Sequence, residues 1–501
     1  MRPSSSPRVL AIGIDAAEPT LVRQWIARGE LPELRALLES GGWGEVRSPA
    51  HIGSGAVWPT FMTGTGPEEH GVYSVLPWDP GTMALVRLTT DRLRPFWTDL
   101  ARGGHSVAIL DVPFAPVVGL PGGIEIAEWG AHDRVRGRMA VSPPGLQAWV
   151  ARTAGTHPFG AGRAEVTGPD DGRGLRTLAA ACQEGARLRG TLAVRLLAER
   201  HPDVLVAVFP EIHHASHYLW HTLEREEPAP LRAPNHAPES AGTDPGSPGL
   251  LEIYREVARQ IGELARAAGD AAILVFSLHG MRATGGIPDI LDPLLRRLGL
   301  AALPGLRAGS WAERRRQVIS LAREIAPEPL RRLYRRARPV DRVPAQTIPL
   351  SYSWARTVAF PVPTDQHGWI RVNLRDRERK GTVAPADYDG LCARLERLLR
   401  GLATRAGQRV VADVLAPGCE GGRPPDLLPD LIVHWEDAAT VNVLRLATPR
   451  LARRARGTQF TGQHAPAGFF IQRPRPGQTF TLGAAAGAEE LYRFIRAALT
   501  N

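Results

Sequence analysis

Short apolar runs alternate with stretches of helical spacing along most of this chain. The runs that predict strands lie at 8–15, 106–113, 203–210 and 271–280. The stretches that predict helices lie at 19–42, 174–199 and 250–268. Because each run has a continuous apolar centre, we expect strands that are buried on both faces. Buried strands that alternate with helices indicate an α/β fold in which helices cover both faces of one sheet.

Two segments interrupt this alternation. Residues 224–249 are rich in Pro, Ala and Gly, which predicts a long loop. Residues 284–345 contain Arg-rich helical pieces, and we expect them to form an inserted cap. The strand pattern resumes at 368–374 and 430–437. The predicted organisation is a core of residues 1–283 and 346–501 that carries a cap of residues 284–345.

The charge of the chain favours one class of partner, and its cysteine content bears on disulfides and metal sites. The 501 residues hold 61 Lys and Arg against 51 Asp and Glu, and the net charge of +10 favours anionic partners. Residues 311–342 hold ten arginines and four acids. A solvated face is the favoured interpretation of this run, and a nucleic-acid or membrane-surface patch is the alternative. The three widely spaced cysteines give neither a disulfide framework nor a CxxC metal site.

The N-terminal sequence MRPSSSPRVLAIGID lacks the apolar run of a signal peptide. No stretch of the chain approaches the ~18 consecutive apolar residues of a membrane-spanning helix. We therefore expect a cytoplasmic protein without a transmembrane segment.

Candidate chemistry gathers where the predicted strands end. The first strand ends at Asp15, and a later one ends in Ser-Leu-His-Gly, which contains His279. A Gly/Pro-rich loop near the C-terminus carries His464. In α/β sheets, chemistry concentrates at the carboxyl ends of the strands. Aspartate and histidine that recur at such ends are what a zinc site, or a similar divalent site, requires.

A cluster of histidines follows the strand at 203–210. The stretch FPEIHHASHYLWH holds four of the chain's 15 histidines. His213 and His217 are four residues apart and share one face of a helix, which His221 continues, whereas His214 points elsewhere. A single histidine is more often structural than a ligand. A pair at this spacing directly after a buried strand favours metal ligands.

Ser54 begins the stretch SGAVWPTFMTGTG, which is compatible with a helix. A serine at the start of a helix is most often an N-cap. The same place attracts anions, and a nearby divalent metal would stabilise the alkoxide. Ser54 is therefore also a candidate nucleophile.

The order of these segments resembles the alkaline phosphatase superfamily, specifically its type I phosphodiesterase/nucleotide pyrophosphatase branch. The resemblance spans nearly the whole chain. It rests on GIDAAEPT, LPELRALLESGGWGEVRS, SGAVWPTFMTGTGPEEHGV, SLHGM, GWIRVNLRDRERKGTV, PDLIV and TGQHAPAGF. It implies an α/β, alkaline phosphatase-like three-layer sandwich with a central, mostly parallel sheet.

The resemblance also implies two divalent metals, usually zinc, that flank the nucleophile. Because this chain departs from the family pattern, we expect one or two per chain. By position, Asp15, His279 and Ser54 itself would bind one metal, and His217 and His464 would bind the other. Ser54 would then attack phosphorus and form a phosphoserine that water hydrolyses.

One departure from the family pattern concerns His213. The family usually has aspartate at this position, so a ligand set of His213, His217 and His464 is predicted here. Three neutral imidazoles bring less negative charge than one carboxylate with two imidazoles. The metal would therefore be a stronger Lewis acid.

A second departure concerns Leu278, which stands where the family has a second aspartate. Leucine cannot bind a metal, so the site beside Ser54 lacks one ligand. Glu211 and the pair His132–Asp133 are candidates for completing it. A structural role is favoured for each of them.

The predicted function is that of a metal-dependent phosphohydrolase of the phosphodiesterase/pyrophosphatase type, which acts on an anionic phosphorylated substrate. A phosphomutase, or a phosphonate or sulfate ester hydrolase on the same scaffold, is an alternative. A non-catalytic relative that binds an anion is another. Ser54-Gly-Ala-Val-Trp lacks the arginine of the sulfatase motif, which disfavours a sulfatase.

Overall fold

The described residues form two compact units. The computed structural model describes residues 7–131, 134–159, 166, 171–225, 249–284, 290–304, 347–363, 366–417, 425–436, 443–446, 451–454 and 460–500. The core unit comprises Met1–Ser74, Thr89–Gly285 and Arg456–Asn501. The second unit comprises Val75–Leu88 and Gly286–Ala455.

The second unit is larger than the predicted insertion. It contains nearly all of the expected cap at 284–345, and it also takes in residues 346–455, which the sequence pattern assigned to the core. The Arg-rich stretch 311–342 and most of the expected loop at 224–249 lie outside the described residues. The helical cap therefore stays a prediction.

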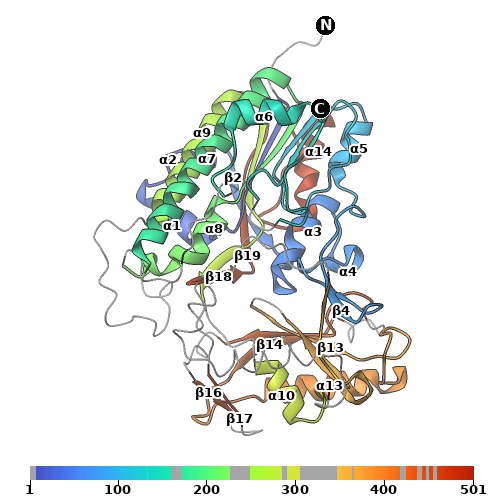
Figure 1. Cartoon of the computed structure of the whole chain (residues 1–501). Helices are drawn as coiled ribbons and strands as arrows, with labels where there is room; N and C mark the ends of the chain where they lie inside the picture. Colours follow the sequence, from blue (N-terminus) through green and yellow to red (C-terminus); the bar gives the residue numbers. More distant parts are fainter. Residues whose placement is uncertain are drawn as a thin grey trace. The chain divides into compact units, whose positions relative to one another are not determined.

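A nine-stranded sheet forms the centre of the core unit (Figure 1). Its strand order is β20-β2-β19-β9-β1-β8-β5-β6-β7. The central strand β1 pairs in parallel with β8 and β9. The strands are β1 (Val9–Ile14), β2 (Gly42–Arg47), β5 (Val107–Leu110), β6 (Ile124–Ala127), β7 (Ala140–Ser142), β8 (Val204–Phe209), β9 (Ala272–Ser277), β19 (Ala467–Arg473) and β20 (Ala485–Gly487).

Helices cover both faces of this sheet (Figure 1). One face carries α1 (Pro19–Arg28), α2 (Pro32–Glu39), α6 (Leu146–Ala154), α7 (Gly172–Arg200) and α9 (Leu250–Ala268). The other carries α3 (Val57–Thr63), α5 (Phe96–Arg102) and α14 (Tyr492–Thr500). Every residue of β1, β8 and β9 is buried, which confirms the predicted α/β sandwich. None of the helices in the described part of the chain combines the length and apolarity that a membrane span requires.

Local backbone conformation and hydrogen bonding explain why two elements end earlier than predicted. The predicted helix at 19–42 is two helices, because Gly29 adopts a φ of 81° and Pro32 starts the next helix. A left-handed residue ends a helix, and proline is favoured in a first turn. The predicted strand at 271–280 ends at Ser277, whose side chain donates a hydrogen bond to the carbonyl of His279.

The second unit has a four-stranded antiparallel sheet in the order β12-β13-β15-β14. Its strands are β12 (Ala359–Val362), β13 (Gly368–Val372), β14 (Val411–Leu415) and β15 (Leu431–Trp435). Two helices, α10 (Leu291–Arg297) and α13 (Tyr388–Arg400), pack against it with apolar side chains.

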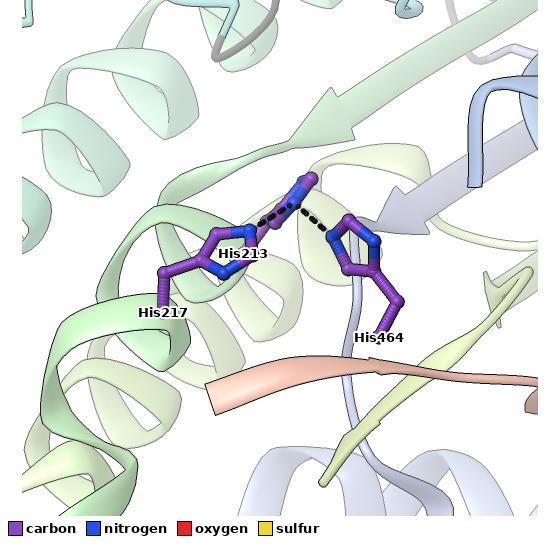
Figure 2. A group of neighbouring side chains, drawn as sticks. All are labelled: His213, His217 and His464. Atoms are coloured by element: carbon purple, nitrogen blue, oxygen red, sulfur yellow. Dashed lines mark hydrogen bonds between the residues drawn. The ribbon is translucent and has the colours of Figure 1, made fainter. Parts of the chain in front are cut away.

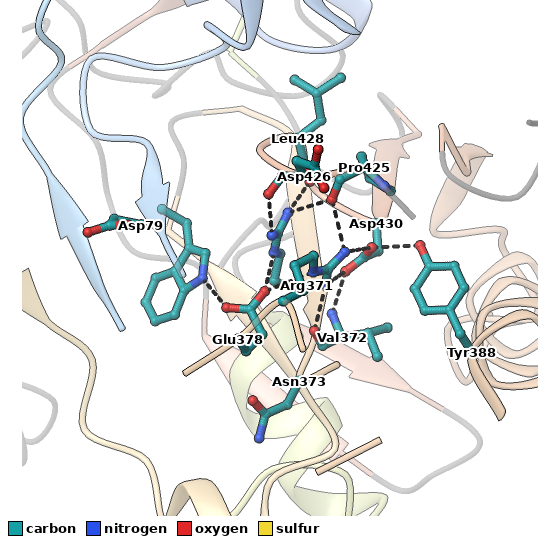
Figure 3. Close-up of polar contacts among 12 residues, drawn as sticks. Asp79, Arg371, Val372, Asn373, Glu378, Tyr388, Pro425, Asp426, Leu428 and Asp430 are labelled. Carbon is teal, nitrogen blue, oxygen red and sulfur yellow. Dashed lines mark hydrogen bonds and ion pairs between the residues drawn. The ribbon is translucent and has the colours of Figure 1, made fainter. Parts of the chain in front are cut away.

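A buried ionic network lies beside this sheet (Figure 3). The Asp430 carboxylate accepts hydrogen bonds from the Arg377 guanidinium at 2.7 Å and from the Tyr388 hydroxyl at 2.6 Å. Arg371 donates to Glu378 at 2.7 Å. Arg371, Arg377 and Glu378 belong to the stretch GWIRVNLRDRERKGTV, and Asp430 belongs to PDLIV, whereas Tyr388 is the first residue of α13. In this chain, those two motifs therefore supply a structural network.

Candidate active site

Three parallel strands bring the first candidate residues to one edge of the sheet. Asp15 directly follows β1, His279 follows the end of β9, and α8 (Glu211–Leu219) begins just after β8. Since β8 and β9 both run parallel to β1, their carboxyl ends meet at the same edge. Asp15 and His279 are both buried there.

Three histidines converge beside this edge (Figure 2). Nε2 of His213 lies 3.1 Å from Nε2 of His217 and 2.8 Å from Nε2 of His464. His213 and His217 come from successive turns of α8, as their spacing predicted. All three side chains are buried, and their ligand atoms lie within 4.8 Å of one another.

His464 lies on a strand, and the expectation of a Gly/Pro-rich loop there was wrong. It belongs to β18 (Gly462–Ala465), which pairs with β10 (Gly280–Ala283) in a two-stranded antiparallel ribbon. Because His464 stands opposite Met281 in this ribbon, its position is tied to the segment that directly follows His279. Backbone pairing with a distant segment overrode the local signal of Gly and Pro.

The hydrogen bonds on the outer ring nitrogens suit these histidines to a metal. His217 Nδ1 lies 3.0 Å from the carbonyl oxygen of Gly462, which can only accept, so this nitrogen carries the proton. His213 Nδ1 lies 2.6 Å from the Asp15 carboxylate and likewise donates. In the neutral rings both Nε2 atoms then present lone pairs to each other, and a divalent cation between them would satisfy both.

Asp15 makes close contacts through both carboxylate oxygens. Oδ2 accepts from His213, and Oδ1 accepts from the indole N–H of Trp58 at 2.9 Å. His279 Nε2 lies 3.5 Å from Oδ1. Burial alone would raise the pKa of Asp15, but His213 and His279 outweigh burial and hold this pKa well below its usual range. Asp15 is therefore a carboxylate at neutral pH.

Ser54 lies in the same pocket as these groups. The pocket is lined by Asp15, Ser54, Gly55, Trp58, Pro113, Phe114, His213 and His279. Ser54 starts a short 3-10 turn, Ser54–Ala56, that leads into α3. Gly53 occupies the N-cap position of that turn. The interpretation of Ser54 as an N-cap, one of the two that the sequence allowed, is therefore wrong. Ser54 therefore lines a pocket together with a carboxylate and two imidazoles.

Two parts of this pocket were not predicted from the sequence. Trp58 stands four residues after Ser54, and this helical spacing was a signal that both residues face the same side. Pro113 and Phe114 follow β5 on the loop that leaves the sheet edge. Phe114 adopts a φ of 62°, a backbone conformation that bulky residues rarely take, and no local pattern signals it.

The residues considered for completing the site beside Ser54 do not reach it in the described part of the chain. Leu278 is fully buried and brings no ligand atom. Glu211 pairs instead with Arg189 and His157, at 3.1 and 3.0 Å from its Oε1. The pair His132–Asp133 lies outside the described residues.

The other two histidines of the cluster have different neighbours. His221 Nδ1 lies 3.3 Å from the Thr461 hydroxyl. The His214 ring packs against Phe159, with 4.5 Å between ring centres. Neither belongs to the three-histidine group. The expectation that His221 continues the helix face of His213 and His217 was wrong, because α8 ends at Leu219 and His221 lies in the 3-10 helix Trp220–Arg225.

Comparison with known proteins places the chain in a family. The model of the family "Type I phosphodiesterase / nucleotide pyrophosphatase" matches residues 9–410. The structure of phosphonoacetate hydrolase from Sinorhizobium meliloti 1021 in complex with phosphonoacetate is similar, with a TM-score of 0.52, 15% identity, and coverage of 98% of this chain and 96% of that chain. Murine ectonucleotide pyrophosphatase/phosphodiesterase 5 in complex with AMP has a TM-score of 0.46 and 12% identity, with coverage of 99% and 95%. At the sequence level no curated protein matches significantly. The match over residues 9–410 shows that the chain belongs to the type I phosphodiesterase/nucleotide pyrophosphatase family.

Proposed function

We propose that this protein is a metal-dependent phosphoric ester hydrolase of the phosphodiesterase or nucleotide pyrophosphatase type, with Ser54 as its nucleophile. The observation that carries this proposal is the pocket in which Ser54 lies with Asp15 and His279, next to three converging histidines. Family membership supports the same reaction class.

The reaction proceeds through Ser54 in two steps. The Ser54 oxygen forms a bond to phosphorus while the bond from phosphorus to the leaving oxygen breaks, and the hydroxyl proton ends on the leaving group. Water then attacks phosphorus, the bond to the Ser54 oxygen breaks, and a proton from water returns to that oxygen. Two in-line displacements replace one difficult substitution by two easier ones.

Other residues prepare the pocket for this chemistry. Trp58 holds Asp15 in place, and Asp15 orients the His213 ring. Pro113 and Phe114 contribute apolar lining to the pocket. A divalent metal held by His213, His217 and His464 would polarise a phosphoryl oxygen and stabilise developing negative charge.

Replacing the nucleophile tests this proposal directly. Ser54→Ala removes the attacking oxygen, so turnover should fall by at least ~1000-fold while the folded state persists. Ser54→Thr keeps a hydroxyl and should retain measurable activity. Ser40→Ala, an exposed serine at the end of α2, is the matched control and should leave turnover unchanged. Retention of most activity in Ser54→Ala would exclude Ser54 as the nucleophile.

A substrate panel separates the hydrolase classes that share this scaffold. The panel contains a phosphodiester, a nucleotide pyrophosphate, a phosphomonoester, a sulfate ester and phosphonoacetate. We expect the highest kcat/KM for the diester or the pyrophosphate. A preference for phosphonoacetate would instead indicate a phosphonate hydrolase. Ligand binding without turnover of any compound would indicate a non-catalytic relative.

A further inference from the structure

The two halves of the candidate site differ in the ligands that they offer. His213, His217 and His464 provide three converging nitrogens, which is the number of protein ligands in many catalytic zinc sites. Beside the Ser54 hydroxyl, the pocket-lining residues other than His213 provide one carboxylate and one imidazole, from Asp15 and His279. The strand end between Ser277 and His279 adds the carbon side chain of Leu278, which is fully buried.

The Asp15 carboxylate is directed at the outer side of a ligand candidate. Its Oδ2 lies 2.6 Å from Nδ1 of His213, while Nε2 of the same ring faces the other two histidines. A carboxylate that accepts from the outer nitrogen of a ligating histidine fixes the orientation of the ring and makes the inner nitrogen a better donor. Asp15 is placed to act on the metal through His213.

Trp58 secures this arrangement from the other side. Its indole N–H donates to Asp15 Oδ1 at 2.9 Å, so each carboxylate oxygen has a protein donor. The Trp58 ring packs in turn against Phe61 and Phe276, which keeps the indole in place. A metal beside Ser54 would compete with the indole N–H for Oδ1.

We propose that this chain binds one divalent metal ion tightly, at His213, His217 and His464, and that Asp15 is a positioning residue for His213 and not a ligand of a second metal. This inference rests on the metal dependence of the proposed function. It departs from the two-metal arrangement that the resemblance implies. The difference follows from Leu278 and from the hydrogen bonds that engage Asp15.

Metal content per chain provides the first test. Full-length protein is stripped with a chelator, reloaded with Zn²⁺, passed through a desalting column and analysed by plasma mass spectrometry. We expect about one equivalent for the wild-type protein, none for His464→Ala, and about one for the control His221→Ala. Two equivalents in the wild type, or none, would overturn the inference. An equivalent that persists in His464→Ala would do the same, because the metal would then lie elsewhere.

The role of Asp15 is tested by metal affinity. Zn²⁺ affinity is measured in a competition titration with a chromophoric chelator. Asp15→Asn should still bind one equivalent, with an affinity lowered by about 10–100-fold. Trp58→Phe removes the indole N–H and keeps an aromatic ring, so a smaller loss in the same direction is expected. An unchanged affinity in Asp15→Asn would contradict the positioning role.

Turnover distinguishes this inference from the proposed function. Ser54→Ala should bind one equivalent with wild-type affinity although it is inactive. Two equivalents together with Ser54-dependent turnover would overturn the one-metal inference and leave the proposed function intact. One equivalent without turnover on any panel substrate would leave the inference intact and contradict the proposed function.

Discussion

His213 connects the two halves of the site through its two ring nitrogens. Nδ1 donates to Asp15, and Nε2 faces His217 and His464. An aspartate at position 213, as the resemblance implies, would offer no N–H to Asp15, and two facing carboxylates would repel each other. Histidine at position 213 therefore suits a site in which Asp15 acts on a ligand instead of on a metal.

At the same scale, His70 forms hydrogen bonds to Thr60 and Val72 in the segment that follows Ser54. The amide of Val72 donates to Nδ1 at 3.0 Å, so Nε2 carries the proton and donates to the Thr60 hydroxyl at 3.0 Å. Burial, with a contribution from Arg92, lowers the pKa of His70 from 6.5 to about 4. The folded protein thus binds a proton less readily here than the unfolded chain does.

This pKa shift predicts a pH-dependent stability. Between pH 6.5 and about 4 the unfolded chain binds a proton at His70 that the folded state excludes. The free energy of unfolding should therefore fall as the pH falls through this range, by at most about 3 kcal/mol. His70→Asn keeps an acceptor for the Val72 amide and should lose less stability on acidification than the wild type, as measured by urea unfolding at several pH values.

The cost of the substitution itself is measured at pH 8, where His70 is neutral in both states. After subtraction of that cost, identical pH profiles for the two proteins would contradict the prediction.

At the scale of elements, a buried ionic network holds the start of α8. Glu211 Oε1 accepts from Arg189 of α7 and from His157, and Arg189 also donates to Asp111 at 2.8 Å. Gly185 makes room for this contact, because a Cβ there would lie 2.5 Å from Nε2 of His157. Since α8 carries two of the converging histidines, the network sets their position relative to the sheet.

Glu211→Gln tests this anchoring. Loss of the carboxylate charge leaves Arg189 with Asp111 as its remaining acid partner in a fully buried place. We expect the free energy of unfolding to fall by about 3–5 kcal/mol, together with weaker Zn²⁺ binding. Glu184→Gln, which breaks a half-exposed pair with Arg187 on α7, is the matched control and should cost about 1 kcal/mol or less. Equal changes in unfolding free energy and Zn²⁺ binding in Glu211→Gln and Glu184→Gln would show that the network does not anchor α8.

At the scale of the whole molecule, the candidate chemistry and the second buried network belong to different units. Asp15, Ser54 and the histidine ligand candidates all lie in the core unit. The network around Asp430 lies entirely in the second unit (Figure 3). There burial raises the pKa of Tyr388, and the Asp430 carboxylate adds a smaller contribution in the same direction.

Asp430→Asn should separate stability from metal binding. The change removes the charge that Arg377 and Tyr388 share, so we expect a loss of about 3–5 kcal/mol in the free energy of unfolding of the second unit. Zn²⁺ content and affinity should stay at wild-type values. Asp413→Asn, at a half-exposed pair with Arg400, is the control for a surface charge. A loss of metal in Asp430→Asn would contradict the assignment of stability and site to separate units.

The sequence by itself determined the parts of this protein that depend on local periodicity. Apolar runs located β1, β8 and β9 to within one to three residues at each end, and the spacing of four placed His213 and His217 on one helix face. Strand ends also identified Asp15 and His279, because parallel strands bring their carboxyl ends together. These features arise from interactions between residues that are near in sequence or share one sheet.

Tertiary structure alone decided which atoms face one another. His213 and His464 are 251 residues apart, and their contact depends on the pairing of β10 with β18. The hydrogen bonds that tie Trp58 to Asp15 and Asp15 to His213 depend on rotamers and burial, which no periodicity encodes. The same holds for Glu211, a ligand candidate in sequence that buried charges turn into an anchor. The physical reason is that a side chain's partner is set by packing across the whole core, whereas its element is set by its neighbours along the chain.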